Sequence, residues 1–261
     1  MDPASVRGTG PGGRIVEADV LRAALGVRPA PAGPVLRGVG QRTLPPSAPV
    51  IASPHFYLQA TADVTVLLDV QRQVAEEVQR ACGAPLRLAD LLLRAMALAL
   101  ADCPQANCVW QDGTLVELGT ADVGFEVEGA SGRVTPVIRQ ADRLRLLDLV
   151  CRRAELAAAA RAGSLPLEAT QGAATSLCDL SEHPVDQCTA VLLPPRSSVV
   201  AAGRAAARPM VLDNQLCMRQ TIGLSLTADP RALSPETAAA LLGRIADLLQ
   251  RPFVLLCERP Q

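Results

Sequence analysis

Lysine is absent from this chain of 261 residues, and all 25 of its basic residues are arginine. A protein without lysine cannot hold a lipoyl, biotinyl or retinal group on a lysine side chain. It also has no side-chain amine that could form a Schiff base with a carbonyl substrate. We therefore expect the chain to carry no lysine-bound cofactor of its own.

Histidine is almost as scarce, since His55 and His183 are the only two. Eight cysteines are scattered along the chain without any C-x-x-C pair, so the ligand spacing of a zinc site is missing and we expect no metal. They are Cys82, Cys103, Cys108, Cys151, Cys178, Cys188, Cys217 and Cys257. Unpaired cysteines in this distribution are typical of free thiols in a reducing cytoplasm, where we expect the protein to be located.

Long apolar runs and an excess of one charge are also missing. No stretch is apolar for long enough to span a bilayer, and the N-terminus does not have the pattern of a signal peptide. The formal net charge is -1 at pH 7. Because no basic surplus is available to bind phosphates or anionic lipids, we expect neither a nucleic-acid partner nor a membrane partner.

What is present is ample core material, with 49% hydrophobic residues, enough for one large domain and an appendage. Residues 1–26 contain a glycine-rich loop and a short helix expected from about Glu17. Such loops can bind phosphate, but this one lacks the Lys-Ser/Thr of a P-loop, so phosphate binding is the weaker interpretation. Residues 27–52 are rich in proline and glycine and predict an extended linker. Residues 53–261 form the main domain.

Patterns of both helix and strand follow one another in the main domain without regular alternation, which predicts the α+β class. The first half predicts a strand from about residue 55 that turns into a helix near Val66, a buried helix ending before Pro104, a hairpin turning at Asp112–Gly113, and two strands around a glycine turn within 121–142. The second half predicts a helix closed by Gly163 and Pro166, strands within 173–180, 188–205 and 221–229, and a last helix over 235–250.

Several runs of residues occur in one order along the chain. They read GTGPGGRIVEADVL, SPHFYL, DLLLRAMALAL, GRVTPVIRQAD and AVLLPPRSSVVAAGR. Together they resemble the dihydrolipoyl acyltransferases of 2-oxoacid dehydrogenase complexes. The resemblance implies a chloramphenicol-acetyltransferase-like fold, a mixed sheet with flanking helices, in a homotrimer with each active site between two subunits. It also implies that residues 1–26 are part of a peripheral subunit-binding domain, and we expect no lipoyl domain in this chain.

The chain departs from the family pattern where the family's catalytic residues are expected. The family motif D-H-R-x-x-D-G is matched by Asp229 and Arg231. Pro230, however, replaces the histidine that acts as general base, and Ser234 replaces the second aspartate. Cys178 stands in place of the serine whose hydroxyl stabilises the oxyanion. Loss of a general base costs ~10²–10⁴ in rate, and loss of an oxyanion donor a further ~10²–10³.

Two functions therefore compete. In the first, the protein is an acyltransferase with an altered site, which moves an acyl group from CoA or a carrier thioester to a non-lipoyl acceptor such as the hydroxyl of a small molecule or a polyketide intermediate. His55, His183 or a nucleophilic Cys178 would then act near Asp229, although each also has a plain structural interpretation. In the second, it is a catalytically inactive trimer, or a structural subunit of an acyltransferase assembly. An acyl carrier protein or an active paralogue is the partner expected besides the chain itself.

Overall fold

The computed structural model describes residues 10–16, 55–130, 132–212 and 214–257, and the chain divides into two compact units, Met1–Thr43 and Leu44–Gln261. In the first unit, a 3-10 turn, η2 (Pro11–Gly13), is described, and Gly12 and Gly13 take positive φ there. The helix expected from Glu17 and the linker 27–52 lie outside the described residues. The predicted domain boundaries remain predictions.

The second unit is built on a mixed sheet of seven strands in the order β1-β11-β9-β8-β4-β7, with β10 paired to the first half of β11. The strands are β1 (Phe56–Asp63), β4 (Val123–Phe125), β7 (Val137–Ile138), β8 (Thr175–Asp179), β9 (Ser198–Ala202), β10 (Ala206–Leu212) and β11 (Gln215–Ala228). Strands β4, β8 and β9 run parallel, and the other pairs are antiparallel. Two small hairpins lie outside this sheet: β2 (Cys108–Gln111) with β3 (Thr114–Glu117), and β5 (Val127–Gly129) with β6 (Gly132–Val134).

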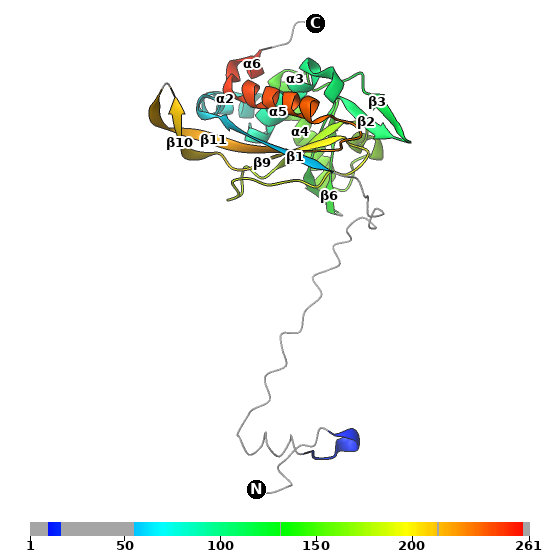
Figure 1. Cartoon of the computed structure of the whole chain (residues 1–261). Helices are drawn as coiled ribbons and strands as arrows, with labels where there is room; N and C mark the ends of the chain where they lie inside the picture. Colours follow the sequence, from blue (N-terminus) through cyan, green and yellow to red (C-terminus); the bar gives the residue numbers. More distant parts are fainter. Residues whose placement is uncertain (1–9, 17–54, 131, 213, 258–261) are drawn as a thin grey trace. The chain divides into compact units, whose positions relative to one another are not determined.

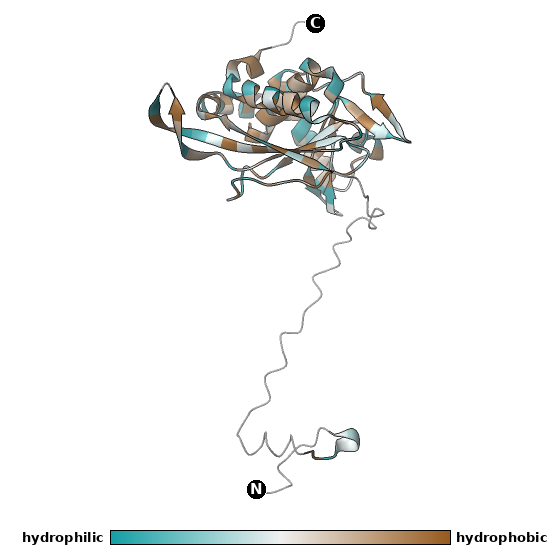
Figure 2. Ribbon diagram, in the orientation of Figure 1, coloured by the Kyte–Doolittle hydropathy of each residue, from teal (hydrophilic) through white to brown (hydrophobic). Residues whose placement is uncertain are grey.

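Helices cover one face of the large sheet, as Figure 1 shows. They are α2 (Thr65–Cys82), α3 (Leu88–Asp102), α4 (Leu146–Arg161), α5 (Pro235–Gln250) and the short α6 (Pro252–Leu256). Short 3-10 helices occur at η3 (Pro104–Ala106) and η4 (Leu167–Thr170). Helix α3 is apolar on all sides and buried from Asp90 to Leu100, because it lies between the sheet and the other helices. Figure 2 shows this apolar interior against the more polar outer helix faces.

Arg94 is the largest fully buried side chain in the described part of the chain, although it carries a charge. Its guanidinium donates to the carbonyl oxygens of Ala141 and Asp142, at 3.2 and 2.9 Å, and to those of Leu255 and Cys257, at 3.4 and 3.1 Å. A buried cation is tolerated when its donors are satisfied in this way. Arg94 therefore ties the C-terminal helix α6 to the centre of the domain.

The second face of the sheet is covered by an irregular segment, 188–193, which we predicted as part of a strand. That prediction is wrong, since only Ser198–Ala202 of the predicted strand 188–205 is in the sheet. The Ser225 and Thr227 hydroxyls of β11 donate to the carbonyl oxygens of Cys188 and Ala190, so side chains of β11 hold the segment in place of backbone pairing. Pro194 and Pro195 follow, and because proline has no backbone N–H to donate, they cannot continue a sheet ladder before β9 begins.

Two other sequence predictions are confirmed. The hairpin turns at Asp112–Gly113, with both residues at positive φ, and the last helix is present as α5. Residues 121–142 form four short strands, where we predicted two. The hairpin of β10 and β11 and the helix α6 were missed. The hairpin turn includes Asn214 at a φ of 59°, a turn residue that the sequence offered as a signal.

Candidate functional site

The turn that follows β11 contains the residues that match the family's base motif. Asp229 is buried, and its carboxylate accepts hydrogen bonds from the backbone N–H and the Nε of Arg231, each at 2.9 Å. The Arg231 guanidinium also lies 5.9 Å from the ring centroid of Trp110, on the β2–β3 hairpin. The Asp229 carboxylate holds the pKa of Arg231 above its ordinary value. The ion pair therefore holds the turn in shape, and the Trp110 contact links it to the β2–β3 hairpin.

Pro230 is exposed at the tip of the same turn, and it has no group that could accept a proton. Ser234 is the N-cap of α5, where its Oγ accepts a hydrogen bond of 3.1 Å from the Thr237 N–H. A serine is among the residues preferred at this position, because it satisfies one of the free N–H groups of the first helical turn. The Ser234 side chain therefore stabilises the start of α5.

Cys178 lies near the C-terminal end of β8, at the opposite end of the strands from this turn. Strand register places Thr175 beside Ser198 and Ser198 beside Ala228, so Cys178 and Asp229 are four residues apart along the strands and two strands apart across them. That is about 13 Å along and about 10 Å across between backbones. One chain does not bring Cys178 and the turn at Pro230 together. His55 directly precedes Phe56, the first residue of β1, which pairs with Ala228 of β11. His55 therefore lies at the same end of the strands as the turn at Pro230.

A cavity of about 280 Å³ opens beside Cys178. Its inner wall is apolar and includes Leu93, Phe125 and Leu177, and its rim is charged, with arginines and carboxylates from four elements. His183, the second histidine, lines the same cavity from the loop after β8 and is exposed. The structure thus groups Cys178 with His183, and it groups His55 with Asp229, Pro230, Arg231 and Ser234.

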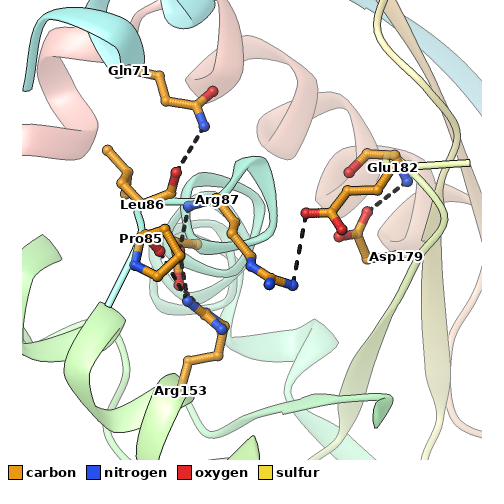
Figure 3. A network of polar contacts seen from close by, with 9 residues as sticks. Gln71, Pro85, Leu86, Arg87, Arg153, Asp179 and Glu182 are labelled. Atoms are coloured by element: carbon orange, nitrogen blue, oxygen red, sulfur yellow. Dashed lines mark hydrogen bonds and ion pairs between the residues drawn. The ribbon is translucent and has the colours of Figure 1, made fainter. Parts of the chain in front are cut away.

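The rim of the cavity is held by ion pairs, part of which Figure 3 shows. Arg87, at the start of α3, points toward Glu182 in the loop after β8, at 3.7 Å. Arg153 of α4 pairs with the buried carboxylate of Asp90 and donates to the Pro85 carbonyl at 3.3 Å. Arg161 is the last residue of α4 and also lines the cavity. It forms no ion pair within the described residues. The cavity therefore presents at least one accessible guanidinium to an anionic ligand.

Glu126 is a polar member of the cavity that sequence reasoning missed. It follows β4, whose Phe125 pairs with Leu177 of β8, so Glu126 lies beside Cys178. Its carboxylate accepts a hydrogen bond of 2.8 Å from Nη1 of Arg133 and raises the pKa of the nearby Cys178 thiol. The signal was available, because an acidic residue in the apolar run VGFEVEG is unusual for a buried strand.

Burial and the neighbouring Glu126 carboxylate together raise the pKa of the Cys178 thiol to about 12. Since the thiolate and not the thiol is the nucleophile, Cys178 is unreactive near neutral pH in this environment. A thiol is also a weaker hydrogen-bond donor than the hydroxyl it replaces, so it stabilises an oxyanion less well. Neither role predicted for Cys178 is favoured by these contacts. Among the described residues no group of three or more histidine, cysteine or acidic side chains could hold a metal ion.

Comparison with known proteins places the chain in a family. The sequence model of the 2-oxoacid dehydrogenases acyltransferase catalytic domain matches residues 48–257, and that of the e3 binding domain matches residues 1–21. The chain therefore belongs to the 2-oxoacid dehydrogenase acyltransferase family. No helix among the described residues is long and apolar enough to cross a membrane.

Two curated relatives illustrate the match. The dihydrolipoyllysine-residue acetyltransferase component of the pyruvate dehydrogenase complex of Rickettsia bellii is 27% identical over 96% of this chain and 63% of the relative. The corresponding component of the acetoin cleaving system of Bacillus subtilis is 30% identical over 98% of this chain and 67% of the relative. The chain thus spans about two thirds of the length of these relatives.

Among solved structures, the Azotobacter vinelandii dihydrolipoamide acetyltransferase is 29% identical, with a TM-score of 0.74 over 79% of this chain and 85% of that one. The cubic core of a pyruvate dehydrogenase multienzyme complex has the same identity and TM-score. The predicted α+β fold, the chloramphenicol-acetyltransferase-like mixed sheet with flanking helices, is confirmed.

The Azotobacter study concerns the role of one serine, one histidine and one asparagine in the catalytic mechanism of that enzyme. There the serine precedes the histidine by 52 positions, and the asparagine follows the histidine by four. In this chain Cys178 precedes Pro230 by 52 positions, and Ser234 follows Pro230 by four.

Proposed function

We propose that this protein is an acyltransferase with an altered active site, which takes an acyl group from CoA or a carrier thioester and transfers it to a non-lipoyl acceptor. The observation that carries the proposal is the cavity beside Cys178, with its apolar wall and its arginine rim. An apolar wall suits an acyl chain and its pantetheine arm, and guanidinium groups suit the phosphates of CoA.

The acceptor is inferred from the turn at Pro230. In the family pattern a histidine at this position deprotonates the acceptor thiol, and proline cannot do so. The equal intervals in the Azotobacter enzyme support the same alignment of Cys178, Pro230 and Ser234. We therefore propose an acceptor of another kind, the hydroxyl of a small molecule or of a polyketide intermediate, in a pathway of secondary metabolism.

The partners follow from the same geometry. Because Cys178 and Pro230 lie at opposite ends of the strands in one chain, a site that uses both ends needs a second subunit, which supports a homotrimer. An acyl carrier protein is the further partner when the donor is a carrier thioester. We place the assembly in the cytoplasm, where the eight cysteines would remain free thiols.

The proposal is tested by titrating acetyl-CoA into the protein in a calorimeter. Arg161→Glu should weaken binding by about 10-fold or more, because a charge-assisted contact to phosphate becomes repulsive. Arg152→Glu is the matched control, since Arg152 is exposed on the same helix but does not line this cavity. Equal affinity of the two variants, or no binding by the wild type, would place the donor elsewhere.

Turnover then separates the acceptors. We expect release of CoA from acetyl-CoA with a panel of hydroxyl acceptors and little or none with dihydrolipoamide. Efficient transfer to dihydrolipoamide would overturn the non-lipoyl acceptor.

A second candidate function is a catalytically inactive trimer that binds the thioester or an active paralogue. The observation that favours it is that neither position keeps a catalytic group: Ser234 caps α5, and burial beside Glu126 raises the pKa of the Cys178 thiol. Binding of acetyl-CoA without release of CoA to any acceptor would support this second function over the first.

A further inference from the structure

Glu126 lines the cavity and lies beside Cys178. Its side chain is 14% exposed, and its backbone N–H donates to the Leu177 carbonyl at 2.9 Å. The ion pair with Arg133 contributes little to stability, because Arg133 is 61% exposed and water screens such pairs. The fold therefore gains little from a carboxylate at this position.

The other candidate bases near the cavity are less suitably placed. His183 is exposed on a loop, and His55 lies at the opposite end of the strands. Asp179 also lines the cavity, but its Oδ1 accepts a hydrogen bond of 2.9 Å from the Ser181 N–H and so closes the turn after β8. Glu126 is the carboxylate that lies beside Cys178, at the position where the acyl group would be bound.

We infer that Glu126 is the general base of the altered site. This inference rests on the proposed function and names the residue that replaces the missing histidine. The Glu126 carboxylate takes the proton of the acceptor hydroxyl while the acceptor oxygen forms a bond to the thioester carbonyl carbon. The carbon–sulfur bond then breaks, and the proton passes from Glu126 to the departing thiolate. The products are an ester and a free thiol, and Glu126 is again a carboxylate.

Four groups face Glu126 from the elements around it. Arg133 comes from β6, Cys178 from β8, and Cys188 and Arg196 from the segment that precedes β9. Two of these four groups are guanidinium cations, so positive charge lies beside the Glu126 carboxylate.

The test measures acetyl-CoA turnover with the best hydroxyl acceptor of the panel. Glu126→Gln should lower kcat by ~10²–10⁴ and change KM for acetyl-CoA little, because a base acts in the transition state. Glu126→Asp, which keeps a carboxylate, should recover part of kcat.

Glu155→Gln is the matched control, because Glu155 is an exposed carboxylate on α4 that does not line this cavity. The inference is overturned if Glu126→Gln keeps the wild-type kcat, or if His55→Ala or His183→Ala removes turnover instead. These results differ from failure of the proposed function, in which the wild type itself releases no CoA. Acetyl-CoA titration and circular dichroism of Glu126→Gln show whether a loss of kcat comes from a loss of binding or of folding.

Discussion

At the scale of single residues, the Cys178 position illustrates how neighbours decide chemistry. A serine and a cysteine differ by one atom, but the thiol here is buried beside a carboxylate that raises its pKa to about 12. A group with that pKa is almost entirely protonated at pH 8, and only its thiolate reacts with electrophiles. Cys178 is therefore protected both by burial and by charge.

This protection can be measured by alkylation with iodoacetamide, followed by mass spectrometry of the modified peptides. Between pH 7 and pH 10 the rate at Cys178 should keep rising without reaching a plateau, because the pKa lies above this range. Glu126→Gln should react faster at every pH, since removal of a negative charge favours the thiolate. Exposed Cys257 serves as the internal control. A plateau near pH 8 to 9 at Cys178 would contradict the raised pKa.

Asp63 has a lowered pKa, in contrast to the raised pKa of Cys178, and the shift affects stability. Burial alone would raise its pKa, but the Thr65 hydroxyl and backbone N–H and the Arg219 guanidinium outweigh burial and lower it. A carboxyl whose pKa is lowered by folding stabilises the folded state at pH values above its unfolded pKa of about 3.9. This stabilisation is lost as the pH falls through the pKa of the folded state.

Asp63→Asn should accordingly lower the free energy of unfolding by about 1 kcal/mol at pH 7, in urea titrations followed by circular dichroism. The difference from wild type should shrink as pH falls below about 4, where the wild-type carboxyl is itself protonated. A deficit that stays constant from pH 7 to pH 3 would show that the charge of Asp63 contributes nothing.

At the scale of elements, helix α5 explains why the chain tolerates a serine in the family motif. Ser234 caps the helix, and aspartate is equally good at an N-cap and is favoured by the helix dipole. Ser234→Ala should cost about 1 kcal/mol in the free energy of unfolding, and Ser234→Asp should cost nothing. Urea unfolding of both variants measures this. A loss in Ser234→Asp as large as that in Ser234→Ala would show that the cap is not the role of Ser234.

Elements also show how far the sequence could predict the fold. Helices α3 and α5 and the turn at Asp112–Gly113 were predictable, because apolar pattern and turn chemistry are local. Segment 188–193 was not, since it has the composition of a strand, and only its tertiary position decides that β11 side chains bind it in place of backbone pairing. Glu126 stands out in its apolar run, but its position beside Cys178 was not predictable, because it depends on a parallel strand pair that is distant in sequence.

At the scale of the whole molecule, the β10–β11 hairpin extends beyond the helices in Figure 1. One of its faces carries Pro209 and Val211 on β10, opposite Met218 and Leu216 on β11. Val211, Leu216 and Met218 are 67%, 76% and 63% exposed in the single chain. Apolar side chains gathered in this way are typical of a surface that another chain covers. This hairpin is the surface through which we expect the proposed trimer to form.

Light scattering coupled to size exclusion tests the assembly independently of any catalytic activity. The wild type should elute at three times the 27.3 kDa mass of the chain. The double variant Val211→Asp and Leu216→Glu should elute as a monomer, because two charges would have to be buried unpaired in the interface. Leu167→Glu is the control, since this leucine is 69% exposed on η4, outside the hairpin, and its replacement should leave the trimer intact. A wild-type monomer, or a double variant that remains trimeric, would show that the hairpin does not hold subunits together.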